Sequence, residues 1–228
     1  MNMAKECLDS PPCDLSIPEI PIWLQSHTIK KHLTSYAAVS NLKKYRRAAH
    51  VCLWARQEGW SQFGKLRGAV MMQLRFDGTF GFPGGLISEG EDVVEGLNRE
   101  LMEEIAWNPA VVPVTWSDYY STQVDSAHNL VLHFFIKQLT LGQFCDLEKA
   151  CPQCHEYGME VMGSVRVPLY TMANMYSGLP AFLNNKFTSI AKEQLLLSLY
   201  HTKLLSEEEV KLAILRSQAE EHRRTLHK

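Results

Sequence analysis

Short apolar runs, separated by segments with Gly, Pro and charged residues, follow one another through the middle of the chain. Runs of this length and spacing are typical of strands in a half-buried or buried sheet. We predict six strands, over residues 48–56, 68–76, 79–82, 111–114, 129–139 and 159–170. The third of these leads into Pro83-Gly84-Gly85, where glycine allows the backbone to turn.

Three further segments have helical spacing. One helix is predicted to begin near Asp92, a second lies in the last half of residues 177–202, and a third begins at Ser206. Ser206 and Glu209 have the S-x-x-E spacing of a capping box, and the charged end of this last helix is expected to be solvated. Helices and strands in this order indicate an α/β fold, in which helices pack outside a mixed β-sheet.

The first 44 residues differ from the rest, because four prolines interrupt residues 11–21. We predict a poorly ordered N-terminal extension over residues 1–44, in which only residues 23–36 have helical patterning, and one domain over residues 45–228. The chain has 228 residues, 46% hydrophobic and 21% charged, and no apolar run as long as a membrane span. No secretory signal pattern is present, so a cytosolic or nuclear protein with reduced cysteines is expected.

The net charge of −2 argues against a uniformly basic surface for nucleic acid. One basic and aromatic cluster, residues 43–47, could still contact RNA, although a solvated flank before the first strand is the simpler explanation. The segment Cys151-Pro-Gln-Cys154-His155 has the C-x-x-C-H form seen in haem attachment and in half of a zinc site. No export signal and no second ligand pair accompany it, so we expect an exposed connection without a metal.

The candidate chemistry lies in the helix predicted to begin near Asp92. Glu100, Glu103 and Glu104 stand at i, i+3 and i+4, so their carboxylates emerge on one face of that helix. Carboxylates this close repel one another unless a cation lies between them, and oxygen ligands without Cys or His select Mg²⁺ or Mn²⁺. The alternative interpretation is a solvated acidic helix face.

The whole segment from Gly85 to Trp107 resembles the Nudix box, G-x5-E-x7-R-E-U-x-E-E-x-G-U, where U is aliphatic. The positions in register are Gly85, Glu91, Arg99, Glu100, Leu101, Glu103 and Glu104. Two departures occur at the end, where Ala106 replaces glycine and Trp107 replaces an aliphatic residue. An alanine costs about 1 kcal/mol if that position needs positive φ, so the departure concerns the exit turn and not the chemistry.

Segments outside the box resemble one branch of this superfamily, the nuclear Nudix hydrolases that decap a small nucleolar RNA and hydrolyse inosine diphosphates. The resemblance spans roughly residues 50–205 and implies an α/β/α sandwich. It also implies roles for individual residues: nucleotide contacts by His50, Arg75, Phe82 and Gln194, and metal binding by Glu100, Glu104 and the Gly84 carbonyl. Gln123 stands where the branch has a metal-binding histidine, which shifts the expected preference toward Mg²⁺.

The resemblance implies metal-dependent hydrolysis of a pyrophosphate linkage, with Mg²⁺ or Mn²⁺ as the cofactor and Glu103 or Glu104 as the base. Glu91 and Arg99 are expected to pair and to fix the loop against the helix. The implied substrates are capped RNA, either small nucleolar RNA or mRNA, and purine nucleoside diphosphates such as inosine or deoxyinosine diphosphate. A homodimer in the nucleolus and nucleoplasm, with the cytoplasm as a second location, is also implied. The alternative is a catalytically weak module that binds RNA or protein, but all the box glutamates are retained.

Overall fold

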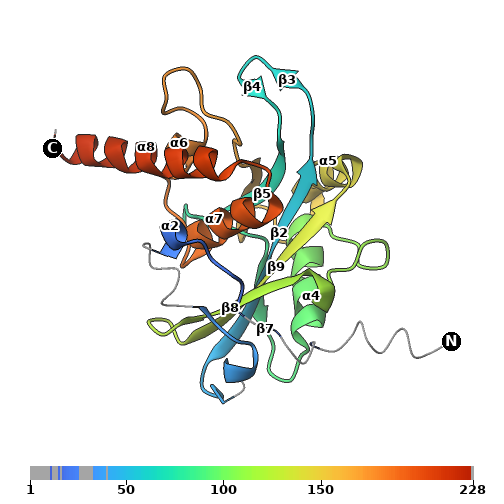
Figure 1. The fold of residues 1–228 in the computed structure, drawn as a ribbon. Coiled ribbons are helices and arrows are strands. Elements are labelled where there is room, and N and C mark those ends of the chain that lie inside the picture. The colour runs from blue at the N-terminus through green and yellow to red at the C-terminus, as the bar shows by residue number, and fades with distance from the viewer. Residues whose placement is uncertain (1–10, 12–14, 16, 26–32, 40, 227–228) are drawn as a thin grey trace.

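A mixed β-sheet forms the centre of the protein in the computed structural model, which describes residues 11, 15, 17–25, 33–39 and 41–226 (Figure 1). The main path of the sheet runs β1 (Leu33–Thr34), β8 (Tyr119–Asp125), β9 (Leu130–Leu139), β2 (Arg46–Arg56), β5 (Gly68–Arg75) and β10 (Val161–Arg166). Short β6 (Phe80–Gly81) pairs with β5, and β7 (Gly84–Ile87) pairs with β2. The β2–β9 pair is parallel and the other pairs are antiparallel. A separate hairpin joins β3 (Trp60–Ser61) and β4 (Gly64–Lys65).

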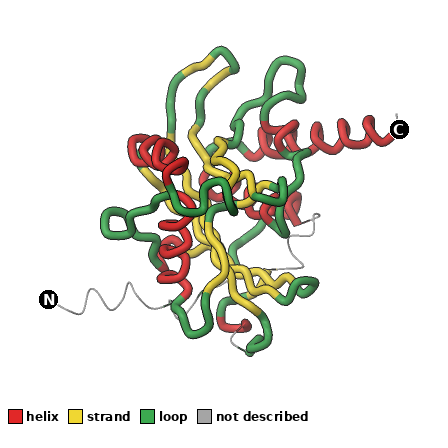
Figure 2. Tube along the Cα trace, turned by 180° about the vertical axis from the view of Figure 1, so that it is seen from behind, coloured by secondary structure: helices red, strands yellow, loops and turns green. Residues whose placement is uncertain are grey.

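Helices cover both faces of the sheet, as the alternation of side chains along its strands requires. Along β2, Val51 and Leu53 belong to the core under α4 (Val93–Ile105) and α5 (Leu141–Ala150). Cys52 and Trp54 belong to the core under α6 (Leu179–Phe182), α7 (Ala191–Thr202) and α8 (Glu207–Leu226). The two groups of helices lie on opposite sides of the strands in the front and back views (Figures 1 and 2). The expected α/β/α sandwich with a mixed sheet is confirmed.

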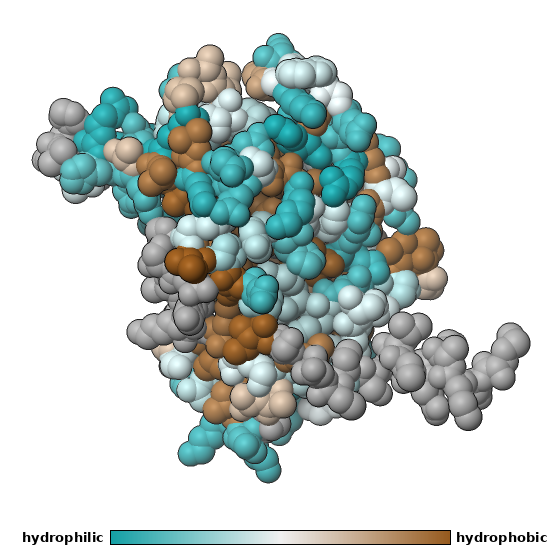
Figure 3. Space-filling view, in the orientation of Figure 1, coloured by the Kyte–Doolittle hydropathy of each residue, from teal (hydrophilic) through white to brown (hydrophobic). Residues whose placement is uncertain are grey.

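The predicted helix starts are also confirmed. The Asp92 side chain caps α4 by accepting hydrogen bonds from the amides of Val94 and Glu95. At the start of α8, Ser206 and Glu209 form the reciprocal capping box, with distances of 2.8 and 3.2 Å. The far end of α8 projects from the body of the protein and carries mainly hydrophilic side chains (Figure 3). In the described part of the chain, no helix combines the length and apolar character needed to cross a membrane.

One prediction between α4 and β10 is wrong, and a second is confirmed only in part. Residues 111–114 form a turn followed by irregular chain instead of a strand, because Pro113 cannot donate to a ladder. Val114 is held instead by the Asn98 side chain, which accepts from its amide at 3.0 Å and donates to its carbonyl at 2.9 Å. The C-x-x-C-H segment, expected to be exposed, begins with the 3-10 turn η3 (Cys151–Gln153), which follows α5. Three of its five residues are exposed, but Cys151 is only 1% exposed and packs in the core.

The N-terminal residues contribute to the domain more than the extension hypothesis implies. Strand β1 pairs with β8, placing Leu33 opposite Gln123, which rules out a helix there. Of the helix expected over residues 23–36, the described residues show only α2 (Ile22–Gln25), whose Leu24 lies fully buried in the core. A 3-10 turn, η1 (Ala37–Val39), follows, and a third, η2 (Trp116–Asp118), precedes β8. Most of residues 1–16 and 26–32 fall outside the described chain, so the extension and the boundary at residue 45 stay predictions.

Candidate active site

A cleft of about 430 Å³ opens where the start of β2, β7 and the start of β9 meet the chain leading into α7. It gathers most of the predicted site residues, although they come from five separate elements. The predicted residues that line it are His50, Arg75, Phe82, Gly84, Glu100 and Gln194. Glu103, Glu104 and Gln123 do not line it.

Two glycines allow β7 to lie close to both β2 and α4, the carboxylate helix that bears Glu100, Glu103 and Glu104. Gly84 pairs with His50 in the strand register and has a φ of +124°, and a Cβ there would collide with the Ala49 carbonyl. A Cβ on Gly85 would collide with the carboxylate of Glu100. A side chain at Gly84 would therefore push β7 away from β2, and one at Gly85 would displace the Glu100 carboxylate.

Glu104 points under the cleft floor, where it is 3% exposed. Its carboxylate accepts a hydrogen bond from the Gly84 amide at 2.8 Å. The pKa of Glu104 is raised to about 7, chiefly by burial and also by the neighbouring Glu100, against the opposing effects of the Gly84 hydrogen bond, Arg75 and Gln73. The buried carboxyl is thus costly to ionise unless a cation lies nearby.

Glu100 faces the cleft itself and shares this electrostatic environment. Its pKa is raised chiefly by burial and secondarily by the nearby charges of Glu103 and Glu160, whereas Arg99 lowers it. Glu160 also lines the cleft, so an acidic side chain from outside α4 stands near Glu100 there. Glu160 is not among the residues predicted from the sequence; its only signal there was an acidic side chain near the start of the strand predicted over residues 159–170.

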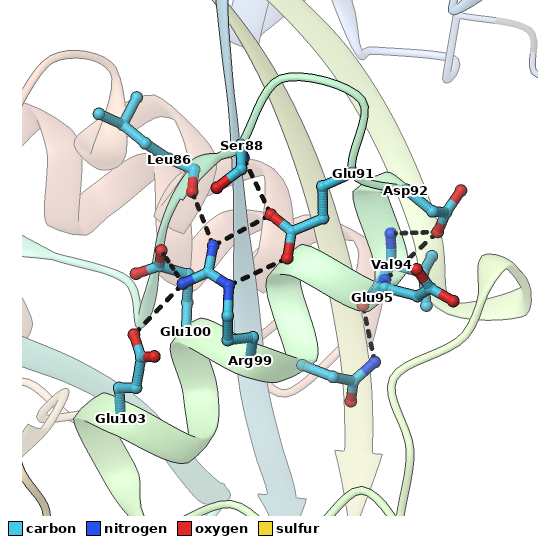
Figure 4. A network of polar contacts seen from close by, with 10 residues as sticks. Leu86, Ser88, Glu91, Asp92, Val94, Glu95, Arg99, Glu100 and Glu103 are labelled. Carbon is cyan, nitrogen blue, oxygen red and sulfur yellow. Dashed lines mark hydrogen bonds and ion pairs between the residues drawn. The ribbon is translucent and has the colours of Figure 1, made fainter.

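Arg99 organises the acidic face by reaching three carboxylates at once (Figure 4). Its Nε and Nη2 donate to the two oxygens of Glu91 at 2.9 and 3.1 Å, which confirms the predicted pair. Its Nη1 donates to Glu100 at 2.7 Å and to Glu103 at 3.2 Å, while Nη2 also reaches the Leu86 carbonyl. This fork ties the loop before α4 to the helix and lowers the pKa of Glu91.

Three of the predicted nucleotide contacts, His50, Arg75 and Gln194, differ in what surrounds their polar groups. Burial and the nearby Arg75 lower the pKa of His50 to about 4, so its imidazole is neutral at physiological pH and can both donate and accept. Arg75 supplies a positive charge beside the carboxylates, and its buried Nε has no protein hydrogen-bond partner. Gln194 projects from α7 and uses its Nε2 to donate to the Gln123 Oε1 at 3.1 Å.

Two predicted roles need correction against this geometry. Phe82 is 1% exposed and packs on Phe134 with ring centroids 5.1 Å apart, so it is a core residue beneath the cleft and does not offer a free face for stacking a purine. Gln123 is fully buried, and its oxygen already accepts from Gln194. Gln123 therefore supports Gln194 from behind the cleft wall. It does not line the cleft and its oxygen is already bonded, so the structure does not support the predicted role of Gln123 as a metal ligand.

The remaining carboxylates fit a hard divalent cation. Glu100 and Glu104 both have pKa values raised by burial, and a bound cation would relieve that cost. Within the described chain, no three His, Cys, Asp or Glu side chains are arranged to hold a metal ion. Mg²⁺ needs no such cage, because it commonly binds one or two carboxylates together with water and substrate phosphates. The donor set therefore suits Mg²⁺ or Mn²⁺ bound jointly with a phosphorylated substrate.

Comparison with known proteins places this site in a family. A sequence model of the Nudt16-like family, described as U8 snoRNA-decapping enzyme-like, matches residues 47–205. The U8 snoRNA-decapping enzyme of Ovis aries is 45% identical over 164 residues, which cover 71% of this chain and 84% of that protein. The enzyme of the same name from Mus musculus is 44% identical over the same length and shares. The Tudor-interacting repair regulator protein of Homo sapiens is 36% identical over 210 residues, which cover 85% of this chain and 97% of that protein.

The family match covers more than half of the chain and includes every residue of the carboxylate helix, the cleft glycines and the predicted nucleotide contacts. Together with the Nudix-box register and the α/β/α sandwich, it shows that the chain belongs to the Nudt16-like family of Nudix hydrolases.

Proposed function

We propose that this protein hydrolyses a pyrophosphate linkage in capped RNA or in a purine nucleoside diphosphate, with Mg²⁺ or Mn²⁺ as cofactor. The observation that carries the proposal is the placement of two box carboxylates at one cleft. Glu100 lines the cleft together with the cationic Arg75, and the buried Glu104 is hydrogen-bonded to the amide of the cleft-lining Gly84. The names of the decapping relatives support capped RNA as the first substrate to test.

Each side chain has a part in this reaction. When bound, the cation neutralises the diphosphate and makes water more acidic, and Glu100, Glu104 and the Gly84 carbonyl would hold it. Arg75 is placed to hold a phosphate by charge, and the neutral His50 to hydrogen-bond a base or ribose. Glu103 is the better base candidate, because its side chain is 43% exposed whereas the Glu104 carboxylate is fixed by the Gly84 amide.

One experiment tests the proposal directly. The full-length protein is incubated with Mg²⁺ or Mn²⁺ and a panel of capped RNA, inosine and deoxyinosine diphosphates and dinucleotide cofactors, with EDTA and Glu104→Gln as controls. We expect metal-dependent products from capped RNA or an inosine nucleotide, and none in either control. Absence of products from the parent, or equal products from Glu104→Gln, would contradict the proposal.

A binding module without catalysis is the second candidate, because the Tudor-interacting relative shares most of its length with this chain. It predicts tight binding of capped RNA or of a protein partner without product formation in the same panel. The carboxylates and the Arg99 network favour the enzyme, since a divalent cation would offset the cost of ionising the buried Glu104 and the half-buried Glu100.

We propose a homodimer and a nuclear location on the resemblance alone. Sedimentation at micromolar concentration tests the first, and a monomer would remove it. Imaging of the tagged full-length protein in cells tests the second, with nucleolus, nucleoplasm and cytoplasm as the compartments to score.

A further inference from the structure

The turn that contains the C-x-x-C segment packs against the end of the carboxylate helix. The Cys154 thiol donates to the Glu104 carbonyl at 2.7 Å. Two residues later, the Glu156 amide donates to the Glu103 carbonyl at 3.1 Å. Carbonyls in the last turn of a helix have no intrahelical partner, so these contacts satisfy groups that α4 cannot satisfy itself.

The way α4 ends makes these external contacts necessary. The helix stops at Ala106, which adopts the left-handed conformation with φ 55° and ψ 36° in place of the glycine usual there. The backbone amides of Ala106 and Trp107 both donate to the Leu101 carbonyl. The carbonyls of Glu103 and Glu104 are therefore left for donors from outside the helix. The local cap is also strained by about 1 kcal/mol, because alanine lacks the freedom of glycine at positive φ.

We propose that the turn of residues 151–156 is the C-terminal cap of the carboxylate helix, and that Cys154 is a positioning residue for Glu104. Glu104 is then held at two points: its carboxylate by the Gly84 amide and its backbone carbonyl by the Cys154 thiol. The proposal rests on the proposed role of Glu104 as a metal ligand. It assigns the C-x-x-C segment to shaping the metal site from behind, and not to binding a metal itself.

The state of the thiol suits a donor. Cys154 is half-buried, and its sulfur lies within hydrogen-bond distance of the Glu104 carbonyl, which is an acceptor only. Its backbone is extended, with φ −75° and ψ 161°, a conformation that valine also favours. Cys154→Ser therefore keeps a donor, and Cys154→Val nearly keeps the volume without one. Cys145 offers a matched control, because its sulfur contacts Arg166 and not α4.

The test measures Mn²⁺ binding to the metal-free full-length protein by electron paramagnetic resonance of free Mn²⁺. We expect Cys154→Val to raise the Kd about threefold to tenfold, and Cys154→Ser and Cys145→Ala to stay within about twofold of the parent. In hydrolysis, the same Val variant should raise the half-saturating Mn²⁺ concentration and leave the KM of the substrate unchanged. Cys154→Ala replaces Cys154→Val if the latter melts below the assay temperature.

Equal Mn²⁺ affinity in the Val and Ser variants, or parent-like affinity in both, would overturn the positioning role. Hydrogen exchange of a peptide over residues 99–107 supplies a readout that needs no metal. Exchange should be faster in Cys154→Val than in the parent, Cys154→Ser or Cys145→Ala. If the parent binds no Mn²⁺, the proposed function fails while the exchange result still decides the cap, and unchanged exchange would overturn it.

Discussion

Replacing Glu104 with glutamine should stabilise the metal-free protein at high pH. Burial holds the pKa of Glu104 near 7 in the folded protein, against 4.5 for the free group. The difference corresponds to about 3 kcal/mol of stability lost once the carboxyl is ionised in both states. Because the folded pKa is the higher one, stability falls as pH rises from about 4.5 through about 7, and glutamine cannot show this loss.

The net gain is smaller than the full electrostatic cost. The glutamine oxygen can still accept from the Gly84 amide, but its NH₂ group must find an acceptor in a buried site. We expect the free energy of unfolding of Glu104→Gln, relative to that of the parent, to increase by about 1–3 kcal/mol as the pH rises from 5 to 8. Urea unfolding in EDTA across this range measures the difference, and Glu103→Gln is the control, since that side chain is 43% exposed.

The reasoning is refuted if the stability difference between Glu104→Gln and the parent is the same at pH 5 and pH 8. The same variant should lose at least about 100-fold in turnover at saturating metal, because a neutral amide removes one charge from the metal site. Stabilisation combined with inactivation separates a functional carboxylate from one that merely packs. A variant that is stabilised but hydrolyses within a few-fold of the parent would remove Glu104 from the catalytic set.

Four further changes test individual contacts. Phe82→Ala should lower the free energy of unfolding by about 3–5 kcal/mol in a thermal melt, as for a core residue, and a loss confined to nucleotide binding would restore the stacking hypothesis. Ala106→Gly should raise stability by about 1 kcal/mol by relieving the left-handed cap, and a decrease in the same melt would contradict the strain. Arg99→Lys should lower turnover, because one lysine ammonium cannot replace the guanidinium that joins Glu91 to Glu100 and Glu103. An unchanged kcat would show that this hydrogen-bond network is not needed for catalysis. Gln123→His should give Mn²⁺ and Mg²⁺ titrations that superimpose on the parent's, whereas a lower Mn²⁺ requirement would reinstate position 123 as a ligand.

The carboxylate helix was predictable because its determinants are local. The Asp92 cap, the i, i+3, i+4 spacing and the Glu91–Arg99 pair all lie within one loop and helix, and each is found as expected. The failed strand at residues 111–114 shows the opposite case. Only Val114 of its apolar residues is fully buried, and Asn98 satisfies the backbone of Val114 through a contact 16 positions back in the chain. A short apolar run therefore does not show by itself which of its residues are buried or which partner satisfies its backbone.

The cleft residues show what a position-by-position match to the family can predict and what it cannot. His50 and Arg75, which the family resemblance marked as nucleotide contacts, lie on adjacent strands of the sheet and both line the cleft. Gln123 and Gln194 lie 71 positions apart, and only the packing of α7 against β8 shows that one amide holds the other. The family match predicts where position 123 lies in the sheet, but it does not predict which group the Gln123 side chain contacts. Because the Gln123 amide is already bonded to the cleft-lining Gln194, we expect it to affect the proposed substrate contact of Gln194, and we expect Glu100 and Glu104 to set the metal preference.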